Sequence, residues 1–534
     1  MNRFLTAAVA AASLWGAACS SHGSTIAPPP PAGKYSNASL NGTYAFMTSG
    51  EVLPTNATSA VPMVRVGSFV ADGSGHITGG VEDVNAAGTV SNAAAITGGS
   101  YSIASDGRGT LSLTVVSSVF NSTVNFAITL TSTADGLMID ETTTGQVSTG
   151  SGNFMLQNPS LFATTAVSGN YIFDFSGLDS AGAPASIVGR FSTTSGSITG
   201  GIDDQNDNGT LTPTGTVLTG SFTSDPQNAN TLSGSGRGLV TINGEIFAFY
   251  IVDATRVRLI SVASSGGAAA DMLTGDAVLQ ASVPASPSGS FAFLVAGSDL
   301  NARNGLIRVG RFDVSGSTVG KILLDVNDAG NEIEHTTFTS STPSVNYDTT
   351  TGRGVVSFSA STLLQYSFVF YLSSSTSGVI QDVSPSDTSP VSQVADGSIA
   401  AQTGGPFTSS NITGPYAMNW SGLVTSGGQF ANTDEEDLLA QETSTSLNLT
   451  GTYDLFQFTG LSLGTNLGST GSINFNGGDG SGGDGKSPTM NVNLSNASAI
   501  HMVVYFVNPQ LAFFANRDNN GASRIVAGIL KAQQ

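Results

Sequence analysis

The sequence is poor in the residues that most often carry catalysis or cross-link a chain. It has one cysteine, four histidines and two tryptophans in 534 residues. A lone cysteine leaves no partner for a disulfide within the chain, and the histidines form no HExxH motif or Cys/His cluster of the kind that binds zinc. Beyond the N-terminal segment, no run approaches the roughly 20 apolar residues of a membrane-spanning helix. These scarcities argue against a disulfide framework, a zinc site of familiar spacing and a helical membrane protein.

Charge is also scarce, and most of it has one sign. Only 10% of the residues are charged, and 17 Lys and Arg against 37 Asp and Glu give a net charge of −20. Because nucleic-acid binding depends on Lys and Arg that neutralise phosphate, we expect no nucleic-acid partner. Aliphatic residues recur in short runs throughout, unlike in a disordered chain. The composition therefore predicts a folded, acidic protein.

The first residues have the features of an export signal. A short basic start precedes an apolar, alanine-rich segment from Phe4 to Leu14, and small residues precede Cys19. A signal that ends at a lone cysteine resembles the bacterial lipoprotein signal, in which the thiol is acylated and becomes the mature N-terminus. That family usually has leucine three residues before the cysteine, where this chain has Gly16. We expect residues 1–18 to be a lipoprotein signal peptide and Cys19 to be lipidated; an ordinary secretory signal is the alternative.

Residues 19–36 predict a tether. Pro28 to Pro31 favour the extended polyproline II conformation, which acts as a semi-rigid spacer. Ser20 resembles the residue that releases lipoproteins to the outer membrane in organisms with two membranes. The resemblance implies an exported envelope protein, an outer-membrane lipoprotein facing the periplasm or the cell surface. The N-terminal lipid would be its only attachment to the membrane.

Four landmarks recur in the same order along the chain. They are Gly-x-aromatic-x-apolar, Val-Gly-x-Phe, an Asp followed two residues later by Asn, and Gly-Arg-Gly; the fourth copy keeps them less closely. Each copy ends with a glutamine, about 120 residues from the next, which is the size of a domain. We therefore expect β repeats at 37–160, 161–284, 285–405 and, diverged from the others, 406–534.

Within a repeat, apolar residues alternate with polar ones in short runs between glycine-rich turns, as from Val124 to Leu130. Such alternation is typical of strands with one buried face. Roughly eight runs per repeat favour an all-β fold in which each repeat is an antiparallel up-and-down barrel. β-sandwich repeats are the alternative, because both architectures bury one face of each strand.

Two family resemblances support this interpretation. The openings of the repeats, GTYAF, GNYIF, GSFAF and GPYAM, resemble the Gly-x-Trp start of lipocalin and avidin-like barrels, with Tyr or Phe in place of Trp. The chain as a whole is similar to multi-repeat lipoproteins of bacterial envelopes. The first resemblance implies barrels, and the second implies a lipid-anchored envelope protein without indicating an activity.

The Asp-x-Asn landmark has the spacing of part of a calcium loop. The second copy matches best, since Asp204, Asn206 and Asn208 precede a glycine that permits a tight turn. The first and third copies have Ala87 and Ala329 in place of Asn208, and none has the twelfth-position glutamate. Asn and Asp beside glycine also form ordinary hairpin turns. Calcium at Asp204, Asn206 and Asn208 is the one cofactor that the sequence suggests, and a hairpin turn is the favoured alternative.

The Gly-Arg-Gly landmark places Arg108, Arg237 and Arg353 between two strands, with Lys486 as the expected counterpart in the fourth repeat. One interpretation is an anion site. The favoured interpretation is structural, because the arginine recurs with the scaffold and arginine side chains often cap carbonyls or stack on rings.

The fourth repeat is the candidate for a small ligand, because it diverges most. Trp420 is the only tryptophan left after removal of the signal, and it shares a strand face with Tyr416. Aromatic rings on one face often stack on sugars, so Trp420 and Tyr416 are candidate ligand-binding residues. Their spacing equally fits the lining of a β core.

Two functions fit the sequence. The first is a non-enzymatic, lipid-anchored envelope protein that acts as a structural or adhesin-like binding array, with an envelope polysaccharide or a protein as its partner. The second is an exported hydrolase, for example a carbohydrate-active one, with a dispersed active site. An enzyme concentrates unmatched polar residues in one cleft, whereas an array keeps its repeated residues. Repetition and the few acid–base candidates favour the non-enzymatic protein, with the oligomeric state left open.

Overall fold

The computed structural model shows four closed antiparallel barrels of eight strands, in tandem along the chain. The all-β fold and the barrel architecture predicted from the sequence are confirmed, and β-sandwich repeats are not formed. The lipidation site predicted at Cys19 lies outside the described residues. The structure describes residues 34–212, 217–228, 231–264, 270–328, 330–335, 343–359, 365–384, 391–425, 433–458, 462–475, 483–495, 499–517 and 524–534.

Barrels 1 and 4 are simple meanders, in which each strand pairs with the next and the last pairs with the first. Barrel 1 comprises β1 (Asn41–Val52), β2 (Val61–Asp72), β3 (His76–Ala86), β4 (Thr89–Ile103), β5 (Arg108–Val116), β6 (Thr123–Leu130), β7 (Asp135–Thr142) and β8 (Ser148–Leu156). Barrel 4 comprises β27 (Gly414–Thr425), β28 (Thr433–Thr445), β29 (Asn448–Gln457), β30 (Ser462–Asn474), β31 (Lys486–Leu494), β32 (Ile500–Asn508), β33 (Leu511–Asn516) and β34 (Arg524–Ala532).

Barrels 2 and 3 have the same order, but their fourth strand is divided in two, and both parts pair with the third strand. Barrel 2 comprises β9 (Gly169–Leu178), β10 (Pro184–Thr194), β11 (Ser197–Asp207), β12 (Thr210–Thr212), β13 (Gly220–Thr223), β14 (Arg237–Ile242), β15 (Glu245–Asp253), β16 (Arg256–Ser264) and β17 (Met272–Leu279). Barrel 3 comprises β18 (Ser288–Asp299), β19 (Asn304–Ser315), β20 (Thr318–Asp328), β21 (Asn331–His335), β22 (Ser344–Tyr347), β23 (Arg353–Ser359), β24 (Gln365–Leu372), β25 (Ser377–Asp382) and β26 (Gln393–Ala401).

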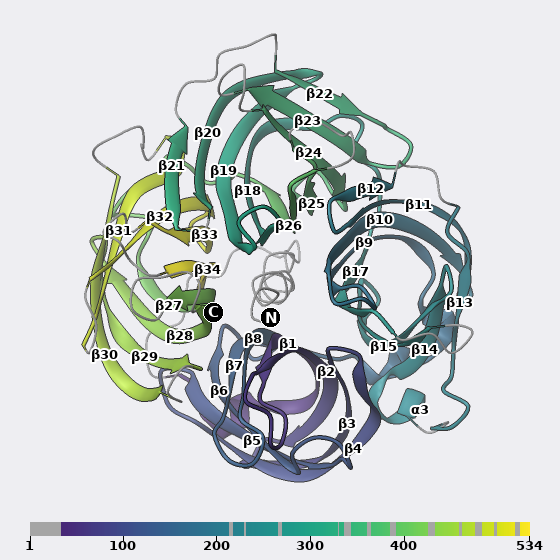
Figure 1. Cartoon of the computed structure of the whole chain (residues 1–534). Helices are drawn as coiled ribbons and strands as arrows, with labels where there is room; N and C mark the ends of the chain where they lie inside the picture. The colour runs from purple at the N-terminus through teal and green to yellow at the C-terminus, as the bar shows by residue number, and fades with distance from the viewer. Residues whose placement is uncertain are drawn as a thin grey trace.

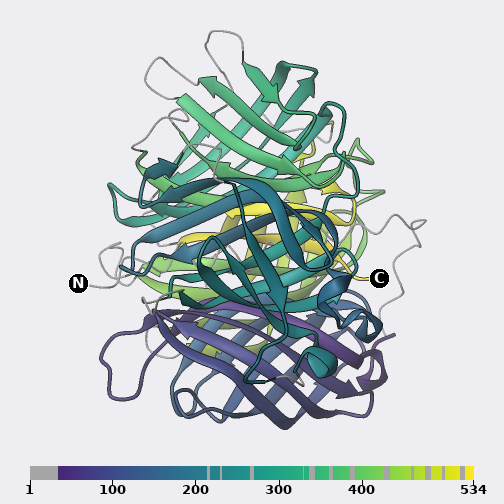
Figure 2. The same ribbon diagram turned by 90° about the vertical axis from the view of Figure 1, so that its right-hand side faces the viewer.

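The barrels form a ring. Figure 1 looks roughly along the barrel axes and shows the four barrels in chain order around a centre, with barrel 4 returning to lie beside barrel 1. The view turned by 90° shows barrel 1 at the bottom, barrel 3 at the top and barrel 2 between them (Figure 2). Each barrel therefore contacts two others, and the first and last meet although they are far apart in sequence.

The position of a strand in the ring explains its apolar pattern. In β1, Tyr44 and Phe46 enter the core of barrel 1, while Ala45 and Met47 on the opposite face join a cluster that includes Ile260 of barrel 2. Both faces of β1 are buried, so its apolar residues are nearly continuous. β5 lies away from a neighbouring barrel over much of its length, and its buried and exposed residues alternate.

The Val-Gly-x-Phe landmark makes room for the aromatic residue that opens each repeat. Phe46 is paired with Gly67, and a Cβ on this glycine would lie 2.5 Å from the Phe46 ring. Barrels 2 and 3 repeat the pair, whereas barrel 4 pairs Met418 with Ala440. The narrower methionine permits the larger residue opposite, because side-chain volumes in a close-packed core must balance.

Helices are few and short. The described residues contain 3₁₀ turns η1 (Asn37–Ser39), η2 (Pro159–Leu161) and η3 (Thr164–Ala166) and the α-helix α3 (Thr231–Ser235). Among these residues no helix has the length and apolar character needed to span a bilayer.

Candidate functional site

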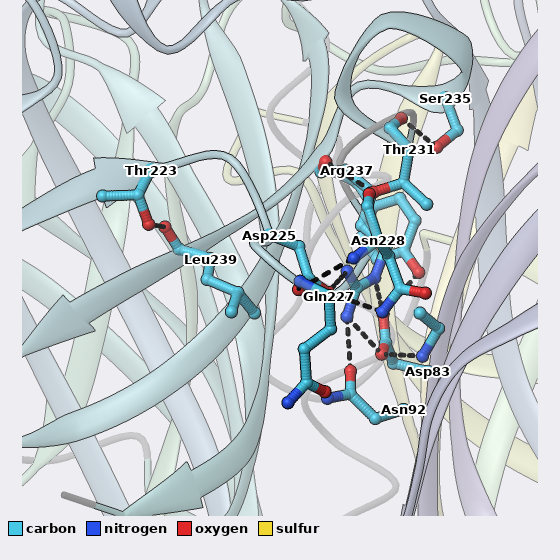
Figure 3. Close-up of polar contacts among 12 residues, drawn as sticks. Asp83, Asn92, Thr223, Asp225, Gln227, Asn228, Thr231, Ser235, Arg237 and Leu239 are labelled. Carbon is cyan, nitrogen blue, oxygen red and sulfur yellow. Dashed lines mark hydrogen bonds and ion pairs between the residues drawn. The ribbon is translucent and has the colours of Figure 1, made fainter.

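The repeated Asp and Arg or Lys residues meet at the junctions between barrels. At the junction of barrels 1 and 2, Asp83 on β3 receives two hydrogen bonds from Arg237 on β14, with Oδ2–Nε 2.7 Å and Oδ1–Nη2 2.9 Å. The hydroxyl of Tyr250 donates to Asp83 Oδ2 over 2.5 Å. Figure 3 shows Arg237 between Asp83, Asn92 and Asp225, and the latter two also accept from its guanidinium. The repeated Asp and Arg therefore bind across the junction rather than within one repeat.

The ion pair of Arg237 and Asp83 is fully buried. The side chains of Arg237 and Asp83 have no exposed surface. Burial alone would lower the pKa of Arg237, but the Asp83 carboxylate raises it above its ordinary value. Burial and the Asp83 charge raise the pKa of Tyr250 well above its ordinary value, so the phenol stays protonated and donates. Because a buried charge without a partner is costly, this geometry holds the two barrels in one arrangement.

The junction of barrels 2 and 3 repeats the arrangement. Asp204 on β11 accepts from Arg353 on β23, with Oδ2–Nε 2.8 Å and Oδ1–Nη2 2.6 Å, and the hydroxyl of Tyr371 donates to Asp204 over 2.6 Å. Asn206 donates to the carbonyl of Gln393 in barrel 3 over 2.9 Å and accepts the amide of Gly209 over 3.1 Å. The Asp-x-Asn landmark thus links one barrel to the next and also closes a turn.

The junction of barrels 3 and 4 uses lysine in place of arginine. Lys486 on β31 lies 3.0 Å from both Asp325 Oδ2 and Glu334 Oε1, and the hydroxyl of Tyr505 donates to Asp325. Asn327 donates to the carbonyls of Asn516 and Arg524 across the junction. Lys486 is therefore the counterpart of Arg237 and Arg353, as the sequence predicts, whereas its carboxylate partners in barrel 3 were not predicted.

The ring closes through the same pair of positions. Arg108 on β5 of barrel 1 binds Asp454 on β29 of barrel 4, and it also donates to Asn466 over 2.9 Å. The hydroxyl of Tyr35 donates to the main-chain oxygen of Gln534 over 2.8 Å, so the two ends of the described chain meet beside this junction.

The glutamine that ends each repeat forms a second set of links. In every case its side-chain amide donates to two main-chain carbonyls of the following barrel, at distances of 2.6–3.1 Å. One carbonyl belongs to the residue directly before the Gly-Arg-Gly landmark, or before Gly-Lys in barrel 4, and the other belongs to the next strand after the one that begins at this Arg or Lys. The donors and acceptors are Gln157 to Ser235 and Ile251, Gln280 to Thr351 and Leu372, Gln402 to Asp484 and Phe506, and Gln533 to Asp106 and Leu130.

The residues predicted to bind calcium have partners within the protein. Asp204 and Asn206 are engaged at the junction, and Asn208 adopts a left-handed φ of 48° while its amide donates to the carbonyl of Pro184. Within the described ranges, no three or more His, Cys, Asp or Glu side chains are grouped to hold a metal. Calcium binding by Asp204, Asn206 and Asn208 stays a prediction, and an ion there would compete with Arg353 for the same carboxylate.

Trp420 and Tyr416, the predicted ligand-binding residues, both lie inside barrel 4. Their rings belong to its apolar core and are 0% and 1% exposed. The Tyr416 hydroxyl donates to the carbonyl of Pro509 over 2.7 Å, and burial raises the pKa of Tyr416 above its ordinary value. Binding of a sugar by these two residues stays a prediction, since neither ring reaches the surface in this arrangement.

A cleft of about 530 Å³ opens beside the junction of barrels 1 and 2. One wall is the β3 segment 78–81, and the other includes Gln227 and Asn228 with α3. Its lining includes the hydroxyl groups of Thr78 and Thr231 and the side-chain amides of Gln227 and Asn228, which suit uncharged polar groups.

Comparisons with known proteins place the chain near no family. No protein-family model matches it, and no curated protein matches it. Among solved structures, a double mutant of the vaccine antigen transferrin binding protein B from Haemophilus parasuis Hp5 has a TM-score of 0.20 at 10% identity, covering 75% of this chain and 83% of that chain. The intact Ap-TbpB, with N and C lobes, has a TM-score of 0.13 at 11% identity, covering 74% and 83%. Scores this low carry no argument about function.

Two parts of the junctions were missed by the sequence analysis. Tyr250, Tyr371 and Tyr505 occupy one register position, each opposite the Arg or Lys of its own barrel. Their recurrence in the same frame was a signal that alignment of the copies would have revealed. The sequence around each Asp gives no indication that its carboxylate pairs with a residue of the following repeat.

Proposed function

We propose that this protein is a non-enzymatic, lipid-anchored envelope protein whose four barrels form a rigid ring for binding a polysaccharide or protein partner. The observation that carries the proposal is the closed set of ion pairs in which the Asp of each barrel meets the Arg or Lys of the next. The most repeated polar residues thus serve assembly. Residues that the copies do not share are then the candidates for recognition.

The position of Tyr35, which directly precedes the first barrel, supports the anchored part of the proposal. Tyr35 and Gln534 are bonded to each other beside the closing junction, so the tether would leave the ring at one defined place. A semi-rigid proline-rich spacer between the lipid and this place would hold the ring away from the bilayer. The cleft between barrels 1 and 2 offers hydrogen-bonding groups for a polar partner such as a polysaccharide.

Metabolic labelling tests the anchor. Cells that express the full chain are fed an alkyne-bearing fatty acid, and labelling of the wild type is compared with that of Cys19→Ser. We expect label only on the wild type, and recovery of the wild type in the outer-membrane fraction where the host has two membranes. A matched Ser20→Asp variant should keep the label and move to the inner membrane. Equal labelling of the wild type and Cys19→Ser would contradict the lipid anchor.

The binding role needs a separate experiment. The purified full chain is incubated with a panel of envelope polysaccharides, and both co-sedimentation and release of new reducing ends are measured. We expect co-sedimentation with at least one polysaccharide and no release of reducing ends. Reproducible release by the purified chain would favour the exported hydrolase instead.

A further inference from the structure

The interiors of barrels 1 and 3 each contain an arginine paired with a carboxylate. In barrel 1, Arg65 donates to Glu82 over 2.7 Å, and Asp140 adds a second carboxyl whose charge acts on the arginine. In barrel 3, Arg308 forms an ion pair with Asp382. Arg65 and Arg308 occupy the same position, directly before the Val-Gly of the second landmark. These charges lie inside the barrels and are separate from those of the junctions.

Barrel 2 keeps the carboxylate but lacks the arginine. Asp203 is paired with Gly189 in the register, as Glu82 is paired with Gly67, so the two acids occupy equivalent positions. The residue before Val-Gly in barrel 2 is Ile187. Barrel 4 has apolar residues or tyrosine at both positions, namely Leu438 and Tyr453. At the Glu82 position barrel 3 has Leu324, and Arg308 pairs instead with Asp382, which holds the position of Asp140 in barrel 1. Barrel 2 is therefore the copy that has an acid at the Glu82 position and no arginine before its Val-Gly.

The Asp203 carboxyl is left without a full set of partners. It is 3% exposed, and its Oδ2 accepts from the side chain of Gln205 over 2.7 Å. Its Oδ1 is buried and has no hydrogen-bond partner among the described residues. Burial raises the pKa of Asp203 above its ordinary value. A buried acceptor of this kind has a full desolvation cost that a bound donor would remove.

This carboxyl faces a cavity of about 300 Å³ at the end of barrel 2. Three phenylalanines form one wall, with ring centroids 4.7 Å apart for Phe173 and Phe175 and 4.9 Å apart for Phe175 and Phe247. Ile187 lines the same cavity, so the missing arginine would have occupied this space.

Two further acids line the cavity. Glu245 accepts from Ser264 over 2.5 Å through Oε2, while its Oε1 is buried and has no partner within the described part of the chain. Asp271 accepts the amide of Ser180 over 2.8 Å. Burial raises the pKa of Glu245 to about 7 and also raises that of Asp271. Three carboxyls and no basic residue thus line a partly aromatic pocket.

We propose that the end of barrel 2 binds a small organic cation, a primary ammonium or guanidinium group on an apolar or aromatic body. The cation would take the place that Arg65 and Arg308 hold in barrels 1 and 3, donating to Asp203 Oδ1. The phenylalanine wall would contact the apolar body, and aromatic faces also attract cations. This site extends the proposed function to a small ligand, but it does not rest on the lipid anchor or on a polysaccharide partner.

The test is isothermal titration of the purified full chain with three ligands that share one body. They are 2-phenylethylammonium, 2-phenylethanol and 3-phenylpropionate. We expect the ammonium to bind at least about tenfold more tightly than the alcohol, because a hydrogen bond between charged groups is stronger than one from a neutral hydroxyl. The carboxylate ligand should not bind, because three acids would repel it. Equal binding of the ammonium and the alcohol overturns the proposal.

Variants of Asp203 and Ile187 test whether the ammonium binds at the end of barrel 2. Asp203→Asn should lower the affinity for the ammonium to that for the alcohol. Ile187→Arg should abolish ammonium binding, because the new guanidinium recreates the internal pair of barrel 1, whereas the control Ile187→Leu should bind like the wild type. If Ile187→Arg binds the ammonium as tightly as Ile187→Leu, the proposal fails. If Asp203→Asn does not fold, the comparison of Ile187→Arg with Ile187→Leu is sufficient to test the proposed site. Neither result depends on labelling at Cys19.

Discussion

The junctions between successive barrels differ from the junction that closes the ring, although each of the four has an Asp paired with an Arg or Lys at the same positions. Each of the three successive junctions adds a tyrosine that donates to the Asp and an Asn that donates to main-chain carbonyls of the next barrel. At the closing junction the tyrosine position is Thr129, and the Asn position is Phe456, which packs with Val147 and Phe458. At these two positions the closing junction has neither the tyrosine nor the asparagine hydrogen bonds of the other three junctions, and an apolar contact takes the asparagine position.

The difference shows what chain connectivity contributes. Successive barrels are joined by short linkers, such as residues 157–168, so a weak junction would still re-form at a high effective concentration. The closing junction joins barrels at opposite ends of the described chain. The chain segment between the two partners of this junction is much longer than the linkers. Bringing the ends of a segment together costs more entropy as the segment lengthens. We infer that it is the first junction to open under stress.

The largest effect should come from breaking a fully buried pair between successive barrels. Arg237→Ala leaves Asp83 and Asp225 buried without their cation, which should cost about 3–5 kcal/mol. Urea unfolding of the full chain measures this. The double variant Asp83→Ala/Arg237→Ala should lose less than the sum of the single variants, and strict additivity would contradict a direct pair.

The closing junction should depend on its apolar cluster. Phe456→Ala removes a ring that is fully buried against barrel 1, and we expect a loss of about 3–4 kcal/mol in the stability of that junction. Hydrogen exchange of β29 and β8 should rise while exchange at the junction of barrels 2 and 3 stays constant. A uniform rise over all four barrels would show that the closing junction does not open by itself.

The closing junction should also weaken as pH rises. Burial raises the pKa of Asp437, which accepts from Thr149 across this junction, from 3.8 to about 7. Its contribution is therefore complete below about pH 4 and is lost as pH rises through about 7, at up to about 1.4 kcal/mol per pH unit. Unfolding free energies of the wild type and Asp437→Asn between pH 4 and 8 measure it. Because the asparagine does not ionise, the wild type should lose stability relative to Asp437→Asn as pH rises from about 4 to 7, and a constant difference would contradict the assignment.

The smallest effect concerns the turns beside the junctions. Asn208 in barrel 2 and Ala87 in barrel 1 both have left-handed backbone, with φ of 48° and 45°. Asparagine tolerates this conformation better than alanine, so Ala87→Asn should stabilise and Asn208→Ala should destabilise by about 0.5–1 kcal/mol. Thermal unfolding of Ala87→Asn and Asn208→Ala beside the wild type measures the sign of each change in stability. Changes of the same sign in both would rule out the conformational explanation.

Much of the fold could be predicted from local patterns, because alternation at Val124 to Leu130 and the recurring glycines depend on neighbours within one barrel. The partners of Asp83 and Arg108 could not. These residues lie 25 positions apart in one repeat, yet each binds a different barrel, since the bond depends on the angle at which barrels pack. The sequence shows that barrel 2 has Ile187 where barrels 1 and 3 have arginine. Only the strand register reveals that Ile187 and Asp203 both lie inside the same barrel.

Closure of the ring is the central claim, and a cross-link tests it most directly. Ser151 Oγ on β8 donates to Asn419 Oδ1 on β27 over 2.5 Å, across the closing junction. Because Cys19 is the only cysteine, Ser151→Cys and Asn419→Cys can be combined in a Cys19→Ser chain without background. We predict a disulfide within one molecule under native conditions, lost when the chain is oxidised in denaturant. Two free thiols in the natively folded chain would contradict the closed ring.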